Sequence, residues 1–155
     1  MEKPEEVVVA DSSVIVKWFV EEEDSDHALK LRDDYVSRKV DIAVPELLFY
    51  EVINSLRYNP DFGLDELKFI GKILEDYDFW TFPLRGEHLE ESIGLATKYG
   101  ITIYDASYLA IGKLRSWVTY TADTKVKEKV KDDAALKHIA GYQSGQPGST
   151  GPNVS

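Results

Sequence analysis

"VVVADSSVIVKW" (residues 7–18) joins a short apolar run to an acidic residue and two serines. The run Val7–Ala10 is typical of a strand that is buried on both faces of a sheet. A carboxylate at the end of such a strand is unfavourable unless a partner offsets its desolvation. Either Asp11 or Ser12 caps a helix that starts at Val14, or the Asp11 carboxylate binds a metal ion where open α/β sheets carry their sites.

The composition is that of one globular domain without disulfides. The chain has 155 residues, of which 43% are hydrophobic and 30% charged, and it contains no cysteine. This length is enough for one core, and the lack of cysteine excludes a thiolate zinc site and a thiol nucleophile. Neither a membrane span nor a signal peptide is visible in the sequence. We therefore expect a cytoplasmic protein that has no contact with a membrane.

The formal net charge of −10 argues against a free-standing nucleic-acid binder, which needs a basic surface. The argument is weaker for a metal-dependent enzyme. In such an enzyme the clustered carboxylates count as negative charge in the sequence, but divalent cations neutralise them when they bind.

Short apolar runs alternate with longer amphipathic segments between residues 7 and 142. This pattern predicts an α/β fold in which helices cover a parallel sheet, giving three layers (αβα). The strand candidates are Val7–Ala10, Asp41–Val44, Phe79–Pro83, Trp117–Tyr120 and Lys137–Ile139.

Seven helices are expected around these strands. The third and fourth follow one another without a strand between them, which predicts an αα-hairpin inserted between the second and third strands. The first helix follows Asp11, the second covers residues 25–38, Pro45 opens the third, the fourth covers residues 64–76, the fifth covers residues 87–99, the sixth starts at Asp105 and the seventh follows Asp123.

The last segment differs in composition from the rest of the chain. Residues 143–155, "QSGQPGSTGPNVS", are rich in Gly, Ser and Pro and contain almost nothing apolar. We interpret them as a disordered tail or a scar left by cloning. Residues 1–142 are then expected to form a single domain.

Four acidic residues are candidates for a metal site. Asp11 and Asp123 follow apolar runs, Asp105 opens a predicted helix, and Glu51 lies at the edge of a helix's buried face. Each has a simpler explanation, since Asp105 and Asp123 are also suited to N-caps and Glu51 to a solvated helix edge. Carboxylates can nevertheless converge at the carboxyl edge of a parallel sheet, where they repel unless cations bind. Oxygen-only ligands favour Mg²⁺ or Mn²⁺.

Four motifs taken together resemble the PIN-domain family and, within it, the VapC-like toxins of prokaryotic toxin–antitoxin pairs. They are "VVADSSVIVKW", "PELLFYEVINSL", "YGITIYDASYLAIG" and "YTADTKV", in this order over about residues 7–140. The resemblance implies a PIN-like five-stranded parallel sheet, metal-dependent endoribonuclease activity on RNA, a homodimer and a VapB-like antitoxin partner. It assigns the metal ligands to Asp11, Glu51, Asp105 and Asp123, and supporting roles to Ser12, Asn54 and Thr121.

If the resemblance holds, Asp11 and Asp105 hold the principal Mg²⁺, and Glu51 and Asp123 contribute directly or through water. A water activated by the metal attacks the phosphodiester and leaves a 5′-phosphate and a 3′-hydroxyl. The candidates for steering the RNA backbone are Lys17, Arg57, Lys113, Arg115 and Lys125.

The aromatic and histidine residues have simpler interpretations than catalysis. Aromatic side chains at helical spacing are favoured as core or dimer contacts over base-stacking surfaces; they are Trp18, Tyr50, Tyr104 and Tyr108. The histidines lack a catalytic motif around them and are interpreted as structural or surface residues; they are His27, His88 and His138.

Other α/β proteins fit the sequence less well. A haloacid-dehalogenase-like domain needs a second aspartate where Ser13 stands, a receiver domain makes poor use of Lys125, and no Gly-rich turn for a dinucleotide follows the first strand. The more serious alternative is a PIN-fold interaction module with little or no nuclease activity. The apolar residues at 47–50 and Trp18 suit a homodimer or an antitoxin-binding surface.

Overall fold

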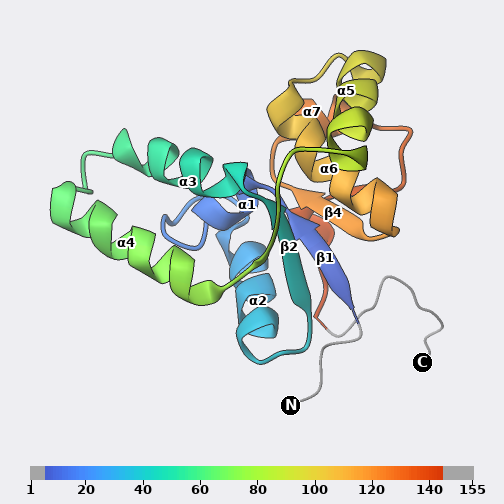
Figure 1. Cartoon of the computed structure of the whole chain (residues 1–155). Helices are drawn as coiled ribbons and strands as arrows, with labels where there is room; N and C mark the ends of the chain where they lie inside the picture. The colour runs from blue at the N-terminus through green and yellow to red at the C-terminus, as the bar shows by residue number, and fades with distance from the viewer. Residues whose placement is uncertain (1–5, 145–155) are drawn as a thin grey trace, which may run out of the picture.

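The computed structural model describes residues 6–144 and has a parallel sheet at its centre (Figure 1). The strand order is β3-β2-β1-β4-β5, and each neighbouring pair is parallel. The predicted five-stranded sheet is confirmed, and every strand lies within one residue of its expected bounds. The strands are β1 (Val7–Ala10), β2 (Asp41–Pro45), β3 (Trp80–Phe82), β4 (Val118–Thr121) and β5 (Leu136–His138).

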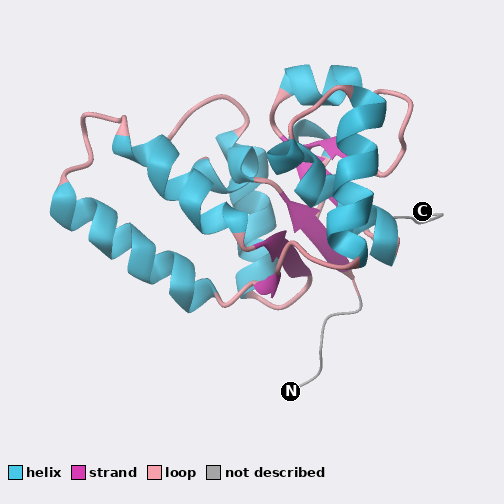
Figure 2. Ribbon diagram, turned by 45° about the horizontal axis from the view of Figure 1, so that its top comes forward, coloured by secondary structure: helices cyan, strands magenta, loops and turns pink. Residues whose placement is uncertain are grey.

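Helices cover both faces of the sheet and complete the three predicted layers (Figure 2). The predicted αα-hairpin is formed by α3 and α4, which project away from the sheet (Figure 1). Two successive helices also connect β1 to β2 and β3 to β4. A pair of helices between two strands is therefore found in three connections, not in one. The helices are α1 (Ser12–Val16), α2 (Ser25–Val36), α3 (Leu47–Arg57), α4 (Leu64–Tyr77), α5 (Glu87–Tyr99), α6 (Ile103–Arg115), α7 (Thr124–Lys129) and the 3₁₀ turn η1 (Ile139–Gly141).

The predicted start of the third helix at Pro45 is wrong. Pro45 is the last residue of β2 and pairs with Phe82 of β3, and α3 begins at Leu47. The N–H of Glu46, one residue later, donates to the Phe82 carbonyl at 3.1 Å. A proline is tolerated at this strand end because the ladder bond is supplied by its neighbour.

The predicted start of the sixth helix at Asp105 is also wrong. The helix begins at Ile103, because the Thr102 hydroxyl accepts the N–H of Asp105 at 3.0 Å and serves as the N-cap. Asp105 therefore lies inside the first turn of α6, where a carboxylate interacts favourably with the helix dipole. The N-cap interpretation of Asp105 is corrected accordingly.

The central strand β1 is buried on both faces. Val8, Val9 and Ala10 are at most 1% exposed, and the core cluster around them includes Ile15 of α1 and Ile111 of α6. A layer of helices on each side leaves this strand no polar surface, which accounts for its continuous apolar run.

The end of the described chain is held by a buried carboxylate. Tyr142 donates its hydroxyl to Oδ2 of Asp34 at 2.5 Å, and the Ser144 hydroxyl donates to Oδ1 at 2.9 Å. Of the expected tail at 143–155, Gln143 and Ser144 are described and the rest lies outside the described residues.

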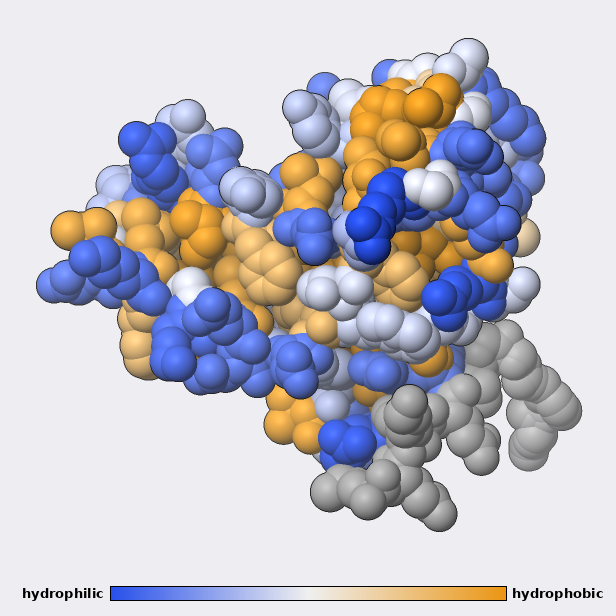
Figure 3. All heavy atoms as spheres, in the orientation of Figure 1, coloured by the Kyte–Doolittle hydropathy of each residue, from blue (hydrophilic) through white to orange (hydrophobic). Residues whose placement is uncertain are grey.

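Apolar side chains are exposed on the α3–α4 hairpin and on α5. Tyr58 is 74% exposed and Phe69 67% exposed on the hairpin, and Ile93 is 50% exposed on α5. Figure 3 shows this apolar surface over both regions. Exposed patches of this kind are typical of surfaces that bind another protein.

A close approach between α6 and β4 requires glycine at position 112. A Cβ atom at Gly112 would lie 2.6 Å from the Trp117 carbonyl oxygen and 2.5 Å from the Thr119 hydroxyl oxygen. We expect Gly112→Ala to lower the free energy of unfolding by about 1–3 kcal/mol, because overpacking outweighs the gain in helix propensity. Urea denaturation followed by circular dichroism measures this change.

Gly94 of α5 is the matched control for this prediction. A Cβ at Gly94 would meet no atom within 4 Å, so Gly94→Ala should raise the free energy of unfolding by about 0.5–1 kcal/mol. Stabilisation by both substitutions would contradict the close contact between α6 and β4.

Candidate active site

The strand order creates a topological switch point at β1. The chain adds β2 and β3 on one side of β1, and β4 and β5 on the other. Ligands of open α/β sheets bind outside the carboxyl ends of the strands at such a point. Asp11 directly follows β1, Asp123 lies two residues beyond β4, and the N–H of Asp11 donates to the Tyr120 carbonyl at 3.1 Å. Asp11 and Asp123 thus follow adjacent strands at the switch point.

Asp11 is half-buried and caps α1. Its Oδ1 accepts the N–H of Ser13 at 3.0 Å and the N–H of Val14 at 3.4 Å. The capping interpretation is therefore confirmed, with the helix beginning at Ser12 rather than at Val14. Capping and metal binding are compatible, because a carboxylate has two oxygens with about four lone-pair sites.

Ser13 is a residue of this site that the sequence reasoning missed. Its hydroxyl donates to Oδ1 of Asp11, accepts the N–H of Ala122 at 2.8 Å and lies 3.4 Å from the Thr121 hydroxyl oxygen. Ser13 therefore joins the segment after β1 to the segment after β4. The two-residue spacing from Asp11 to Ser13 could have indicated this contact, since an aspartate side chain often bonds the backbone two residues further on.

Thr121 and Asp123 complete the β4 side of the site. Thr121 is fully buried, and its hydroxyl accepts the N–H of Asp123 at 3.0 Å. Asp123 is exposed and caps α7, because its Oδ1 accepts the N–H groups of Lys125 at 2.9 Å and Val126 at 3.2 Å. The N-cap interpretation of Asp123 is confirmed.

Glu51 reaches the site from α3 and is held by a buried tyrosine. Its Oε1 accepts the hydroxyl of Tyr108 at 2.7 Å, and Tyr108 is only 2% exposed. Burial raises the pKa of Glu51, and hydrogen bonds from Tyr108 and Ser12 partly oppose this rise. Asn54 lies further along α3 and is exposed. The link from Tyr108 to Glu51 was not predicted, because it joins residues 57 positions apart.

Burial and mutual repulsion raise the pKa values of three acidic residues. The pKa of Asp11 is raised to about 7, chiefly by burial and to a smaller extent by the charge of Asp105, against the opposing effect of hydrogen bonds from Ser13 and Thr121. Burial and the charge of Asp105 likewise raise the pKa of Glu51. The pKa of Asp105 is raised by burial and by Asp123. The structure therefore places the other three predicted carboxylates, Asp11, Glu51 and Asp123, within electrostatic reach of Asp105.

The donors at this edge fit a hard divalent cation. They are carboxylate oxygens, the ligands that Mg²⁺ and Mn²⁺ prefer, and a bound cation would relieve their repulsion. Within residues 6–144, no three histidine, aspartate or glutamate side chains are grouped closely enough to hold a metal ion. The chemistry of the donor set fits the ion, but the side chains must approach one another further to share it.

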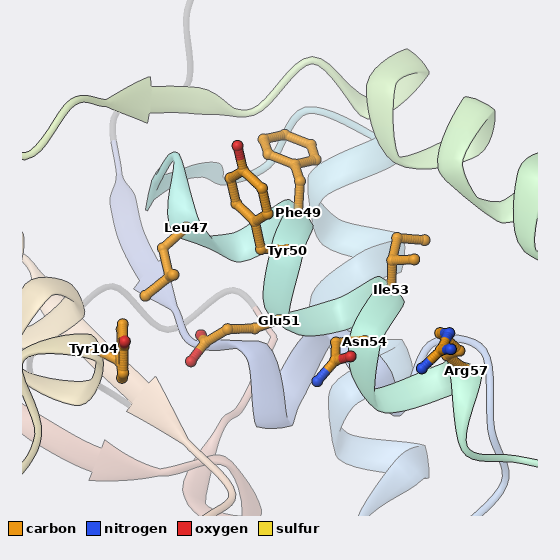
Figure 4. A pocket seen from close by; sticks show the side chains of 8 residues that line it. All are labelled: Leu47, Phe49, Tyr50, Glu51, Ile53, Asn54, Arg57 and Tyr104. Atoms are coloured by element: carbon orange, nitrogen blue, oxygen red, sulfur yellow. The ribbon is translucent and has the colours of Figure 1, made fainter.

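An open groove of about 630 Å³ borders Glu51 (Figure 4). In Figure 4, Glu51, Asn54 and Arg57 follow one another along α3, and Tyr104 of α6 lies opposite. Tyr104 is 59% exposed and Tyr50 76% exposed. Of the four aromatic candidates, these two are thus at the surface of the groove.

Trp18 and Tyr108 are core residues, as the favoured interpretation held. Trp18 is 7% exposed, and its indole N–H donates to the Ala28 carbonyl at 2.8 Å. The expectation that Trp18 adds to a partner-binding surface is therefore wrong. The apolar periodicity of a helix does not tell which aromatic side chain turns inward.

Four of the five predicted steering residues contact other side chains, among them Arg57, whose guanidinium lies 5.8 Å from the ring centre of Tyr58. The ammonium of Lys17 lies 3.1 Å from Glu22, and that of Lys113 lies 2.9 Å from Asp133. The guanidinium of Arg115 lies 5.3 Å from the ring centre of Trp80 and also stacks on Phe82 and Trp117. Arg57 lines the groove beside Glu51, and Lys125 lines a pocket beside Asp105 and Asp123.

The histidines have structural or surface roles. The ring nitrogens of His88 lie 3.0 Å from the Pro83 carbonyl and 2.8 Å from the Ser107 carbonyl. His138 accepts the N–H of Ala140 at 3.0 Å and caps η1. His27 lies on α2 beside Asp24 and Asp26.

Comparison with known proteins defines the class of this fold and site. The family model described as PIN domain matches residues 8–132, and the chain belongs to the PIN-domain family. It is also 31% identical over 128 residues to a protein named Ribonuclease VapC3 from Pyrobaculum aerophilum, covering 79% of this chain and 93% of that protein. The chain is thus a homologue of a VapC-type ribonuclease.

Solved structures share the fold at low sequence identity. A toxin-antitoxin complex from Klebsiella pneumoniae matches with a TM-score of 0.64 at 14% identity, covering 85% of this chain and 97% of that one. FitAcB from Neisseria gonorrhoeae matches with a TM-score of 0.64 at 14% identity, covering 87% and 99%. VapBC-5 from Mycobacterium tuberculosis matches with a TM-score of 0.53 at 16% identity, covering 86% and 97%. Among residues 6–144, no helix is long and apolar enough to cross a membrane.

Proposed function

We propose that this chain is a Mg²⁺- or Mn²⁺-dependent endoribonuclease and the toxin of a VapBC toxin–antitoxin pair. The observation that carries the proposal is the acidic edge formed by Asp11, Glu51, Asp105 and Asp123: Asp11 and Asp123 follow adjacent strands at the switch point, and Asp105 lines one pocket together with Asp123. The 31% identity to a ribonuclease named VapC3 supports the same conclusion. Carboxylates that repel one another in a half-buried site are typical of a metal centre.

The four carboxylates divide the work between binding and proton transfer. Asp11 and Asp105 would hold the principal cation, and Glu51 and Asp123 would contribute directly or through water. When bound, the cation lowers the pKa of water and stabilises the leaving oxygen. One carboxylate accepts the proton of the attacking water. In-line attack by the water oxygen forms a new P–O bond and breaks the P–O3′ bond, and O3′ takes up a proton from solvent. One product then carries a 5′-phosphate and the other a 3′-hydroxyl.

Ser13, Thr121 and Tyr108 orient these carboxylates without touching the substrate. Ser13 and Thr121 bond the segments that carry Asp11 and Asp123, and Tyr108 holds one oxygen of Glu51. Ordered ligands of this kind bind a cation at a smaller entropic cost.

The partners follow from the proposed toxin role. A VapB-like antitoxin with a basic side chain complements the acidic edge, and the groove beside Tyr50 and Tyr104 offers apolar surface for it. The neighbours named as toxin–antitoxin complexes support such a partner. We also expect a homodimer and a cytoplasmic location, where RNA and the antitoxin are found together.

A PIN-fold interaction module without nuclease activity is the alternative. It is favoured by the absence of a ready-made group of three metal ligands among residues 6–144 and by the exposed apolar residues of the α3–α4 hairpin. The two functions differ in one property, since only the nuclease turns over RNA.

Cleavage of a labelled single-stranded RNA by the purified protein tests the proposal. We expect cutting with Mg²⁺ or Mn²⁺, none with EDTA, and products that carry 5′-phosphates. An absence of cutting together with an absence of cation binding in calorimetry would favour the interaction module. Cation binding without cutting would point to a different RNA target.

Tyr108→Phe tests the orientation of Glu51. Phenylalanine fills the same buried space but lacks the hydroxyl that bonds Glu51. We expect kcat for RNA to fall about 10-fold to 100-fold and the Mn²⁺ concentration for half-maximal activity to rise. Tyr35→Phe is the matched control, because its hydroxyl bonds the Tyr77 carbonyl instead. Equal activity of the two variants would show that the Tyr108 hydroxyl has no positioning role.

A further inference from the structure

A second pocket borders the acidic residues Asp105 and Asp123. Its volume is about 390 Å³, and it is lined by the segment 100–102, by Asp105 of α6 and by residues on and next to α7. Asp105 and Asp123 form one part of the wall, and Lys125 and Lys129 form another. The pocket therefore places two positive charges directly beside two of the proposed metal ligands.

The two lysines are held differently. The ammonium of Lys129 donates to the Gly100 carbonyl at 3.2 Å, which fixes it at the rim, and its charge lowers the pKa of Asp105. Lys125 is exposed, and no hydrogen bond or ion pair joins its ammonium to another residue of the range 6–144. Lys17 and Lys113, in contrast, are paired with acidic residues. Lys125 therefore has a charge available for a ligand.

We propose that this pocket binds a backbone phosphate of the RNA strand next to the bond that is cut, through the ammonium groups of Lys125 and Lys129. The inference rests on the proposed function. It adds which residues contact the RNA backbone next to the bond that is cut.

The charge balance of the chain favours a phosphate as the ligand. With a net charge of −10, the protein as a whole repels RNA. The carboxylates of the acidic edge would neutralise the charge of a bound cation. Positive side chains beside that edge are therefore needed to attract the phosphates of RNA. Lysine binds phosphate as a point charge and needs no fixed geometry, which suits an exposed rim. Lys125 and Lys129 would therefore position the strand without reading its sequence.

Removal of the two charges tests this inference. The variants are Lys125→Gln, Lys129→Gln and the double variant, compared by the KM and kcat of cleavage of labelled single-stranded RNA over a series of salt concentrations. Lys30→Gln/Lys39→Gln is the charge-matched control, since both lysines are exposed and lie on α2 and just before the amino end of β2. Lys125→Gln is decisive, because Lys129 also acts on Asp105.

We expect Lys125→Gln to raise KM severalfold with kcat changed less than about threefold, and the double variant to raise KM about 10-fold. The slope of log(kcat/KM) against log[salt] should flatten by about 0.7 for each lysine–phosphate ion pair that the substitutions remove. A KM and a salt slope equal to those of the control, in a protein whose wild type cuts RNA, would overturn the phosphate pocket. A wild type that neither binds nor cuts RNA would instead overturn the proposed function, and the pocket with it.

Discussion

Asp11→Asn and Asp105→Asn should each lower kcat/KM for RNA by about 10³-fold. Each substitution removes a negatively charged ligand from the acidic edge, and the loss of metal-based stabilisation is worth several kcal/mol in the transition state. Asparagine keeps the size of the side chain and caps a helix as well as aspartate does. Steady-state cleavage of labelled RNA in saturating Mg²⁺ measures the effect.

Asp65→Asn is the control for these variants. Asp65 is an exposed acidic residue in the first turn of α4, away from the acidic edge, so its substitution should leave kcat/KM within about twofold. Full activity of Asp105→Asn would remove Asp105 from the catalytic group and with it the proposed site. A loss in all three variants would mean that net charge alone controls activity.

The stability of the metal-free protein should fall as pH rises, and Asp11 should be one cause. The pKa of Asp11 is about 7 in the folded protein, against an ordinary value of 3.8. Between these values the folded state holds a proton that the unfolded state has released, so the contribution of Asp11 to stability decreases as pH rises through this window. The free energy of unfolding of Asp11→Asn should therefore rise by about 1–2 kcal/mol relative to that of the wild type between about pH 4 and about pH 7, after discounting for partial exposure.

A divalent cation should make the wild type more stable than Asp11→Asn. The cation binds the ionised carboxylates of the wild type, so Mn²⁺ should stabilise the wild type at about pH 8 and have little effect on Asp11→Asn. Binding should also weaken about 10-fold for each pH unit below about 7, since protons compete for Asp11. Urea denaturation in EDTA and in Mn²⁺ measures both effects. A wild type whose stability in EDTA is constant over this pH range would contradict the unfavourable burial of Asp11.

Most of the sheet could be predicted from the sequence. Strands such as Val7–Ala10 are buried on both faces, and a continuous apolar run between turn residues predicts such a strand. The helix starts were harder to predict. Thr102 rather than Asp105 caps α6, and Pro45 ends β2, because both positions depend on bonds to neighbouring backbone groups.

The acidic residues of the site could be proposed in advance, but the reason given for Asp105 was incomplete. Asp11 and Asp123 do follow adjacent parallel strands, whereas Asp105 is supplied by the first turn of a helix. The residues that hold these groups in place could not be foreseen. The Ser13 hydroxyl accepts the N–H of Ala122, a residue 109 positions away in the sequence. No local sequence pattern predicts an interaction of that range.

The lysines illustrate the same limit. The sequence "TADTKVKEKVK" offers four lysines at and beyond residue 125, and only the path of the segment at Gly100 places Lys129 beside Asp105. The exposed charges of a short helix are equivalent until tertiary structure selects among them.

Calorimetric titration of the metal-free protein with Mn²⁺ at about pH 8 tests the central claim most directly, because it asks whether the acidic edge binds a cation at all. We expect saturable binding by the wild type, and a loss of that binding in Asp11→Asn and in Asp105→Asn, whereas Asp65→Asn should bind as the wild type does. An absence of saturable binding by the wild type, or equal binding by all four proteins, would contradict that claim.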